Sequence, residues 1–97
     1  MTRLVFAPQA AQDLKRLTEF LLETDPRAAN ETVSVLIDGL RILKQHPLVG
    51  RTVENNYREL IISRGRTGYV ALYSYDITRN VVLILAIRHQ RESGFVE

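Results

Sequence analysis

The residues best suited to chemistry stand together near the C-terminus, in the run Arg88-His89-Gln90-Arg91-Glu92. An imidazole with its ordinary pKa of about 6.5 can accept or donate a proton near neutral pH, and arginines stabilise charge that develops on a phosphate. Arginine is also a frequent anchor residue in protein interfaces. The run therefore predicts either a phosphate-cleaving site or a recognition patch.

An uninterrupted apolar segment carries this run. Residues 81–87 read VVLILAI, and such a strand is typical of a sheet that is covered on both faces. A buried strand holds its side chains in fixed directions. We therefore expect the run to be mounted rigidly at the end of the most buried element.

The composition excludes several function classes. The chain has 97 residues, no cysteine, two histidines and a net charge of +2, so we expect one domain over residues 1–97. Thiolate chemistry is excluded, and the isolated His46 and His89 do not match a zinc site, so no metal or cofactor is expected. No apolar run reaches the roughly 20 residues of a membrane span, and no secretory signal is visible. We expect a cytoplasmic protein without a membrane partner.

Two helices are expected in the first half of the chain. Residues 3–7 read as a short strand that ends at Pro8, where an amphipathic helix begins and runs to about Thr24. Asp25 as N-cap and Pro26 at the first helical position predict a second helix. The two helices should form an antiparallel hairpin.

The second helix carries two apolar lines. Its main stripe includes Leu36 and Leu40, and a weaker line of Ala28, Val35 and Ile42 lies about 120° away. The weaker line either widens the core face or forms a docking groove for a partner helix, with Gly39 permitting close approach.

Three β-rich runs follow, at residues 57–63, 67–75 and 80–89. The predicted order is β-α-α-β-β-β. It favours an α+β domain in which a helical hairpin packs on one face of a small, mostly antiparallel sheet.

Several short motifs follow one another along the chain. They are Phe6-Ala7-Pro8-Gln9-Ala10 with Asp13-Leu14, Pro26 with Ala28-Ala29, Leu43 and His46-Pro47 with Gly50-Arg51, Tyr57-Arg58-Glu59-Leu60, Gly68-Tyr69-Val70 with Tyr73, and residues 84–92. In this order and spacing they resemble the ParE/RelE superfamily of bacterial toxins, on the ParE side. The resemblance implies a RelE/ParE-like fold and a toxin of a type II toxin–antitoxin pair. It also implies a ParD-like antitoxin, which wraps the toxin with its C-terminal segment and makes the only contact with operator DNA.

The resemblance covers two activities. ParE-like toxins inhibit DNA gyrase by binding it, whereas RelE-like toxins cut messenger RNA on the ribosome with sheet lysines and arginines and a late tyrosine. Here the family's sheet arginine position holds Val70, the late tyrosine position falls at or near Phe95, and no lysine follows Lys44. We therefore expect a gyrase inhibitor that is not an enzyme. The alternative is a ribosome-dependent messenger RNA endonuclease that relies on His89, Arg88 and Arg91.

Two sets of contact residues are predicted. Target contacts are expected at Arg58, Arg88, His89, Arg91 and Phe95, with Arg64 and Arg66 as possible extensions of the patch. Antitoxin contacts are expected at Phe20, Leu22, Val35 and Ile42, through an added helix or strand.

Each contact prediction has a structural alternative. His89 could be a hydrogen-bonded residue at a strand end, and Arg88 and Arg91 could pair with Glu92, Glu59 or Asp76 at little gain in stability. The tyrosines at 69, 73 and 75 share one face of their strand and are more typical of a covered core edge than of base stacking.

Overall fold

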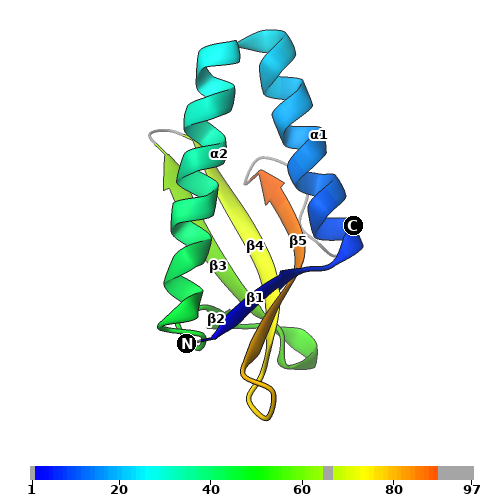
Figure 1. Cartoon of the computed structure of the whole chain (residues 1–97), viewed down its shortest axis with the longest axis vertical. Coiled ribbons are helices and arrows are strands. Elements are labelled where there is room, and N and C mark those ends of the chain that lie inside the picture. The colour runs from blue at the N-terminus through cyan, green and yellow to red at the C-terminus, as the bar shows by residue number, and fades with distance from the viewer. Residues whose placement is uncertain (1, 65–66, 90–97) are drawn as a thin grey trace.

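Two helices cover one face of a five-stranded sheet in the computed structural model of the chain (Figure 1). The structure describes residues 2–64 and 67–89. None of the helices in these two ranges is both long and apolar enough to cross a membrane. The elements are β1 (Arg3–Phe6), α1 (Pro8–Thr24), α2 (Pro26–Arg41), a 3-10 turn η1 (Ile42–Lys44), β2 (Arg51–Thr52), a 3-10 turn η2 (Glu54–Asn56), β3 (Arg58–Arg64), β4 (Thr67–Asp76) and β5 (Val81–His89).

The sheet has the strand order β1-β5-β4-β3-β2. The β1 strand runs parallel to β5, and the other neighbours are antiparallel. This arrangement confirms the predicted α+β fold with a helical hairpin on a mostly antiparallel sheet. The predicted order lacked β2, which has two residues and is therefore too short to show a hydrophobic alternation.

One residue, Asp25, joins the two helices. Its backbone N–H donates to the carbonyl of Leu21 at the end of α1, and its side chain accepts a hydrogen bond from the N–H of Ala28 at 3.3 Å. Pro26 occupies the first turn of α2, where a missing N–H costs nothing. The predicted capping residues are thus confirmed, and the tight junction makes the helices antiparallel (Figure 1).

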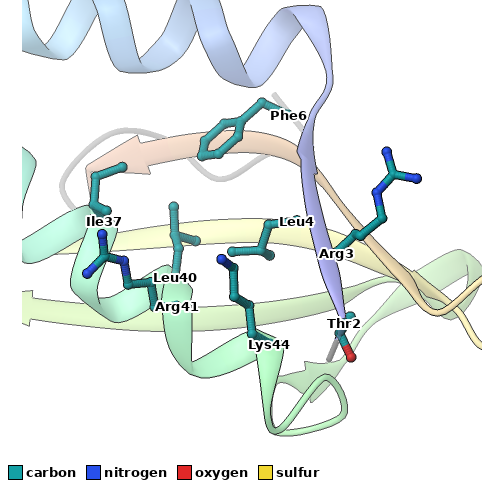
Figure 2. Close-up of a pocket in the computed structure, with 8 residues that line it drawn as sticks. All are labelled: Thr2, Arg3, Leu4, Phe6, Ile37, Leu40, Arg41 and Lys44. Carbon is teal, nitrogen blue, oxygen red and sulfur yellow. The ribbon is translucent and has the colours of Figure 1, made fainter.

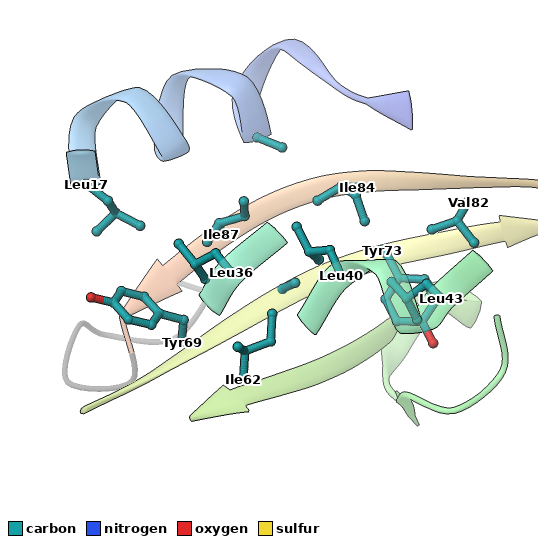
Figure 3. Close-up of a cluster of buried hydrophobic side chains, with 12 residues drawn as sticks. Leu17, Leu36, Leu40, Leu43, Ile62, Tyr69, Tyr73, Val82, Ile84 and Ile87 are labelled. Carbon is teal, nitrogen blue, oxygen red and sulfur yellow. The ribbon is translucent and has the colours of Figure 1, made fainter. Parts of the chain in front are cut away.

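The core lies between the helices and the sheet (Figure 3). Leu36 and Leu40 of α2 pack over the strands together with Leu43 of η1, and all three are buried. Tyr69 and Tyr73 on β4 are also buried and belong to this cluster. The tyrosine face of β4 is therefore core, as the sequence favoured.

Only one face of β5 is fully covered, which corrects the prediction of burial on both faces. Val82, Ile84 and Ile87 are completely buried, whereas Val81 and Leu83 are half-buried. The helices lie on a single face of the sheet (Figure 1). The strands β1 and β4 flank β5 within the sheet, so they cover its edges and not its other face.

A β-bulge at Leu85 changes which side chains of β5 face the helices. Leu72 pairs with Ala86 and Tyr73 pairs with Ile84, so Leu85 has no partner on β4. One extra residue reverses the alternation that follows it. As a result the side chain of His89, which pairs with the buried Tyr69, lies on the helix-covered face. The side chain of the preceding residue, Arg88, leaves the backbone on the opposite face.

Gly39 allows α2 to approach its own sheet. A Cβ atom at Gly39 would lie 2.9 Å from the Cγ2 atom of Ile62 on β3, closer than real Cβ contacts come. Gly39 therefore permits close packing of α2 on β3 within this chain and not the approach of a partner helix. This finding corrects the role proposed for Gly39 in a docking groove.

Candidate functional site

The end of β5 is fixed to α1 by the carboxylate of Asp13. Its Oδ2 atom accepts a hydrogen bond from the backbone N–H of Ile87 at 3.0 Å and lies 2.5 Å from Nη1 of Arg88. Its Oδ1 atom accepts a hydrogen bond from Nε2 of Gln9 at 2.9 Å. The Asp13 side chain is only 3% exposed, and these donors compensate the cost of burying its charge.

The position of Asp13 follows from where β1 ends. The last residue pair of β1 and β5 is Phe6 with Ile84, and the N–H of Ala7 still donates to the carbonyl of Ile84. Beyond this point the chain leaves the sheet and enters α1, so β1 offers no carbonyl to the backbone N–H of Ile87. The carboxylate of Asp13 accepts that hydrogen bond in its place. The sequence did carry a signal for this, since Asp13 lies at helical spacing between the buried Ala10 and Leu17.

Arg88 is therefore tied to the fold at the candidate site. Its guanidinium meets the buried Asp13 and donates to the carbonyl of Ile87 at 3.1 Å, and its side chain is 27% exposed. The sequence suggested Glu92, Glu59 or Asp76 as structural partners. Glu92 lies outside the described residues, and the acidic partner that the structure describes is Asp13 of α1.

His89 packs against an aromatic ring of β4. Its ring lies 5.2 Å from the Tyr69 ring, edge to face, with an angle of 87° between the planes. Successive side chains of a strand point to opposite faces. His89 and Arg88 thus leave the backbone in opposite directions, and the guanidinium of Arg88 reaches Asp13 of α1.

Arg58 lies in a different part of the sheet. It pairs with Tyr73, which in turn pairs with Ile84, whereas His89 stands five positions further along β5. At about 3.3 Å per residue, the row of paired residues that contains Arg58 lies roughly 16 Å from the row that contains His89. The expectation that Arg58 extends the Arg88 patch is corrected by this position.

Arg58 and Tyr73 together clamp the loop that enters β2. Nη1 of Arg58 donates to the carbonyls of Leu48 at 3.1 Å and of Gly50 at 2.8 Å. The Tyr73 hydroxyl accepts from the N–H of Gly50 at 2.8 Å and donates to the carbonyl of Pro47 at 2.9 Å. Four hydrogen bonds thus fix a loop whose two central side chains, at residues 48 and 49, are exposed and apolar.

The clamp has electrostatic and steric consequences. Burial raises the pKa of Tyr73 above its ordinary value of 10.0, while the hydrogen bond from Gly50 and the charge of Arg58 act in the opposite direction. A Cβ atom at Gly50 would lie 2.6 Å from the Tyr73 hydroxyl and 2.8 Å from the carbonyl oxygen of Glu59. Only glycine fits there, and no local sequence pattern reveals the contact because Tyr73 lies 23 residues further along the chain.

The four predicted antitoxin contacts do not form one surface. Val35 and Ile42 are seven residues apart and share a side of α2, whereas Phe20 and Leu22 are two residues apart and point about 200° away from each other on α1. Phe20, Leu22 and Ile42 are exposed. Val35 is half-buried and packs against the core.

Some predicted residues cannot be placed. Arg66, Arg91 and Phe95 lie outside the described residues, and Arg64 is described only as the last backbone position of β3. Within residues 2–64 and 67–89, no group of three histidine, aspartate or glutamate side chains is arranged to hold a metal ion.

Sequence comparison identifies the class of protein to which this fold and site belong. A profile described as the ParE toxin of type II toxin-antitoxin system, parDE, matches residues 4–94. The chain belongs to this ParE toxin family. It is also 35% identical over 92 residues to Toxin RelE3 of Caulobacter vibrioides, covering 95% of this chain and 98% of the relative. Toxin RelE1 of the same organism is 38% identical over 65 residues, covering 67% and 70%.

Solved structures share the fold. A structure of the chromosomal ParDE TA system from P. aeruginosa matches with a TM-score of 0.75 and 23% identity, over 90% of this chain and 94% of that chain. The toxin-antitoxin complex RelBE2 from Mycobacterium tuberculosis matches with a TM-score of 0.59 and 25% identity, over 92% and 98%. The predicted superfamily and RelE/ParE-like fold are confirmed.

Proposed function

We propose that this toxin inhibits DNA gyrase by binding it and that it is not an enzyme. The observation that carries the proposal is the placement of Arg88 and His89 at the end of β5. Arg88 is engaged by the buried Asp13, and His89 packs on Tyr69 from the other side of the strand. Metal-free RNA cleavage needs a base, an acid and a cation around one phosphate. Two consecutive residues that leave their strand on opposite faces, one of them held by a buried carboxylate, are poorly placed for that task.

The neighbouring position on β4 adds support. Val70 pairs directly with Arg88, at the position where the family resemblance puts an arginine in RNA-cutting members. An apolar side chain there stabilises no phosphate charge. A binding surface needs no such groups and requires only anchor residues that are held on a rigid element.

The proposed target contacts are centred on the end of β5. His89 and the exposed part of Arg88 begin this surface, and Arg91 and Phe95 follow in the sequence. Arg58 lies outside this surface, where it holds the loop at residues 47–50.

The second candidate is ribosome-dependent cleavage of messenger RNA. The names of the two relatives, Toxin RelE3 and Toxin RelE1, favour it. In that case His89 is the proton-transfer group, and Arg88 and Arg91 stabilise the phosphate charge.

A ParD-like antitoxin is the proposed partner in either case, and operator DNA is reached only through it. Both solved neighbours are described as toxin–antitoxin systems or complexes. We place the toxin in the cytoplasm, where gyrase and ribosomes work.

Parallel assays with the purified toxin test the proposal. Gyrase should lose supercoiling activity with no ribosome present, while messenger RNA in a ribosome assay stays intact. Loss of messenger RNA with gyrase unaffected would establish the second candidate instead.

A further inference from the structure

The sheet has an apolar face that the helices do not cover. Both α1 and α2 lie on the other face (Figure 1). On the face away from them, which we call the open face, apolar side chains come together from four neighbouring strands: Val5 of β1, Leu83 of β5, Val70 and Leu72 of β4, and Ile61 of β3. Ile61 is 55% exposed, and the other four are half-buried. The open face therefore presents one patch of partly exposed apolar surface.

Figure 2 shows how the side chains of β1 divide between the two faces. Leu4 and Phe6 point into a groove between β1 and α2, whereas Arg3 points away from it. Because successive side chains of a strand alternate, Val5 lies on the open face together with Arg3. Leu83 is the partner of Val5 in the pairing of β1 with β5, so these two side chains adjoin.

The fold alone does not require an apolar open face. In a sheet that is covered on one side, strands usually alternate apolar residues towards the core with polar residues towards water. Here Val70 and Leu72 alternate with the buried Tyr69, Ala71 and Tyr73 along β4. Threonine suits a strand as well as valine does. The apolar choice therefore indicates that a partner covers this face. It also accounts for the sequence of β5, which is typical of burial on both faces although the helices cover only one.

The open face continues the surface that is proposed to contact gyrase. Arg88 leaves the backbone on this face and pairs with Val70, which pairs with Ile61 on its other side. A specific interface buries about 800 Å² on each partner, which the two residues at the end of β5 cannot supply. Interfaces combine an apolar centre with a polar rim. The apolar patch matches such a centre, and the ion pair of Arg51 with Glu59 borders it on β2 and β3.

The predicted antitoxin contacts lie on the other layer of the molecule. Phe20 and Leu22 belong to α1, Val35 belongs to α2, and Ile42 begins the turn that follows α2. A partner on the open face does not compete for these side chains, because the sheet lies between them and that face (Figure 1). The open face is therefore left for the target.

We propose that the open face is the apolar centre of the gyrase-binding surface, and that it receives an uncharged apolar patch of gyrase. The exposed part of Arg88 and the residues that follow it in the sequence then form one side of the polar rim. The proposal rests on the proposed function and deepens it, because it names the face of the toxin that the target covers and the chemistry of the contact.

A charge on the open face tests the proposal. Ile61→Glu, at the most exposed residue of the patch, should need at least about 10-fold more toxin than wild type for half-maximal inhibition of gyrase supercoiling. Ile77→Glu is the matched control, since Ile77 is 75% exposed and lies in the turn between β4 and β5. The control should stay within about 2-fold of wild type. Equal losses in both variants would overturn the proposal.

A second variant removes apolar surface without adding a charge. Val70→Thr/Leu72→Thr keeps a residue type that suits a strand and should give an intermediate loss of gyrase inhibition. Both open-face variants should bind the cognate antitoxin with wild-type affinity, which also shows that they fold. A loss of antitoxin affinity in step with the loss of inhibition would contradict the inference.

Two further outcomes distinguish other partners and the proposed function itself. A wild-type dimer in analytical ultracentrifugation that Ile61→Glu converts to a monomer would assign the open face to a second copy of this chain instead. Gyrase inhibition that wild type and both open-face variants share equally would overturn this inference alone. Absence of inhibition by wild type would overturn the proposed function together with it.

Discussion

Asp13 on α1 and Arg88 on β5 form an ion pair at 2.5 Å that joins the helical hairpin to the end of β5. The same carboxylate binds the backbone N–H of Ile87, so it fixes both the main chain and the guanidinium. The strand end that carries the proposed target surface is therefore set by a residue far away in the sequence.

Replacing Asp13 by Asn keeps a side-chain oxygen for Ile87 but removes the charge. We expect the free energy of unfolding to fall by about 2 kcal/mol, less than for a fully buried pair because Arg88 is partly exposed. Urea denaturation measures this change. Asp38→Asn, which removes the exposed partner of Arg41, is the control and should change stability by less than about 0.5 kcal/mol. Equal effects of the two substitutions would show that the buried carboxylate has no special role.

Replacing Tyr73 by Phe should loosen the loop at residues 47–50. The substitution leaves the N–H of Gly50 and the carbonyl of Pro47 without their partner, at a cost of about 1–3 kcal/mol in the free energy of unfolding. Tyr57→Phe removes a hydroxyl at an exposed position and should be nearly neutral. A neutral Tyr73→Phe would contradict the clamp.

The raised pKa of Tyr73 predicts a pH effect. Below pH 10 both the folded and the unfolded state keep the phenolic proton, so the stability contributed by this group is fully present. As the pH rises from 10.0 towards the raised folded-state pKa, the unfolded state loses the proton first and stability falls. Wild type should therefore lose more stability than Tyr73→Phe between pH 9 and 11, measured by urea denaturation at each pH. Parallel pH profiles of the two proteins would rule out the effect.

Ile42→Glu should weaken antitoxin binding while the toxin still folds. Ile42 is exposed, so a charge there costs little stability but disrupts an apolar contact. Val35→Glu is a less specific test, because Val35 packs against the core and its loss should also destabilise the fold. Calorimetric titration with the antitoxin measures the effect. Ile77→Glu, at the most exposed large apolar residue described, is the control. Unchanged affinity of Ile42→Glu would remove this face of α2 from the contact.

The elements of the fold were predictable because local signals mark them. Pro8, Asp25 and Pro26 fix the helix ends, and long apolar runs mark β4 and β5. The strand β2 and the bulge at Leu85 were not predictable, since both depend on pairing between distant residues.

The candidate site was harder to predict than the fold, for the same reason. Arg88 and His89, the described part of the terminal run, were correctly placed at the end of a core strand. The bulge, however, decides that His89 leaves the backbone towards the helix layer and Arg88 away from it, and no local pattern reveals a bulge. The partner of Arg88 was also missed, because Asp13 lies in a helix that only the folded chain brings to β5.

Gyrase supercoiling by purified enzyme, titrated with this toxin in the absence of ribosomes, tests the central claim most directly. We predict dose-dependent inhibition that the cognate antitoxin reverses, and weaker inhibition by Arg91→Ala or by removal of residues 93–97 at unchanged thermal stability. Full supercoiling activity at all toxin concentrations, together with cleavage of messenger RNA on ribosomes by the same preparation, would contradict the claim.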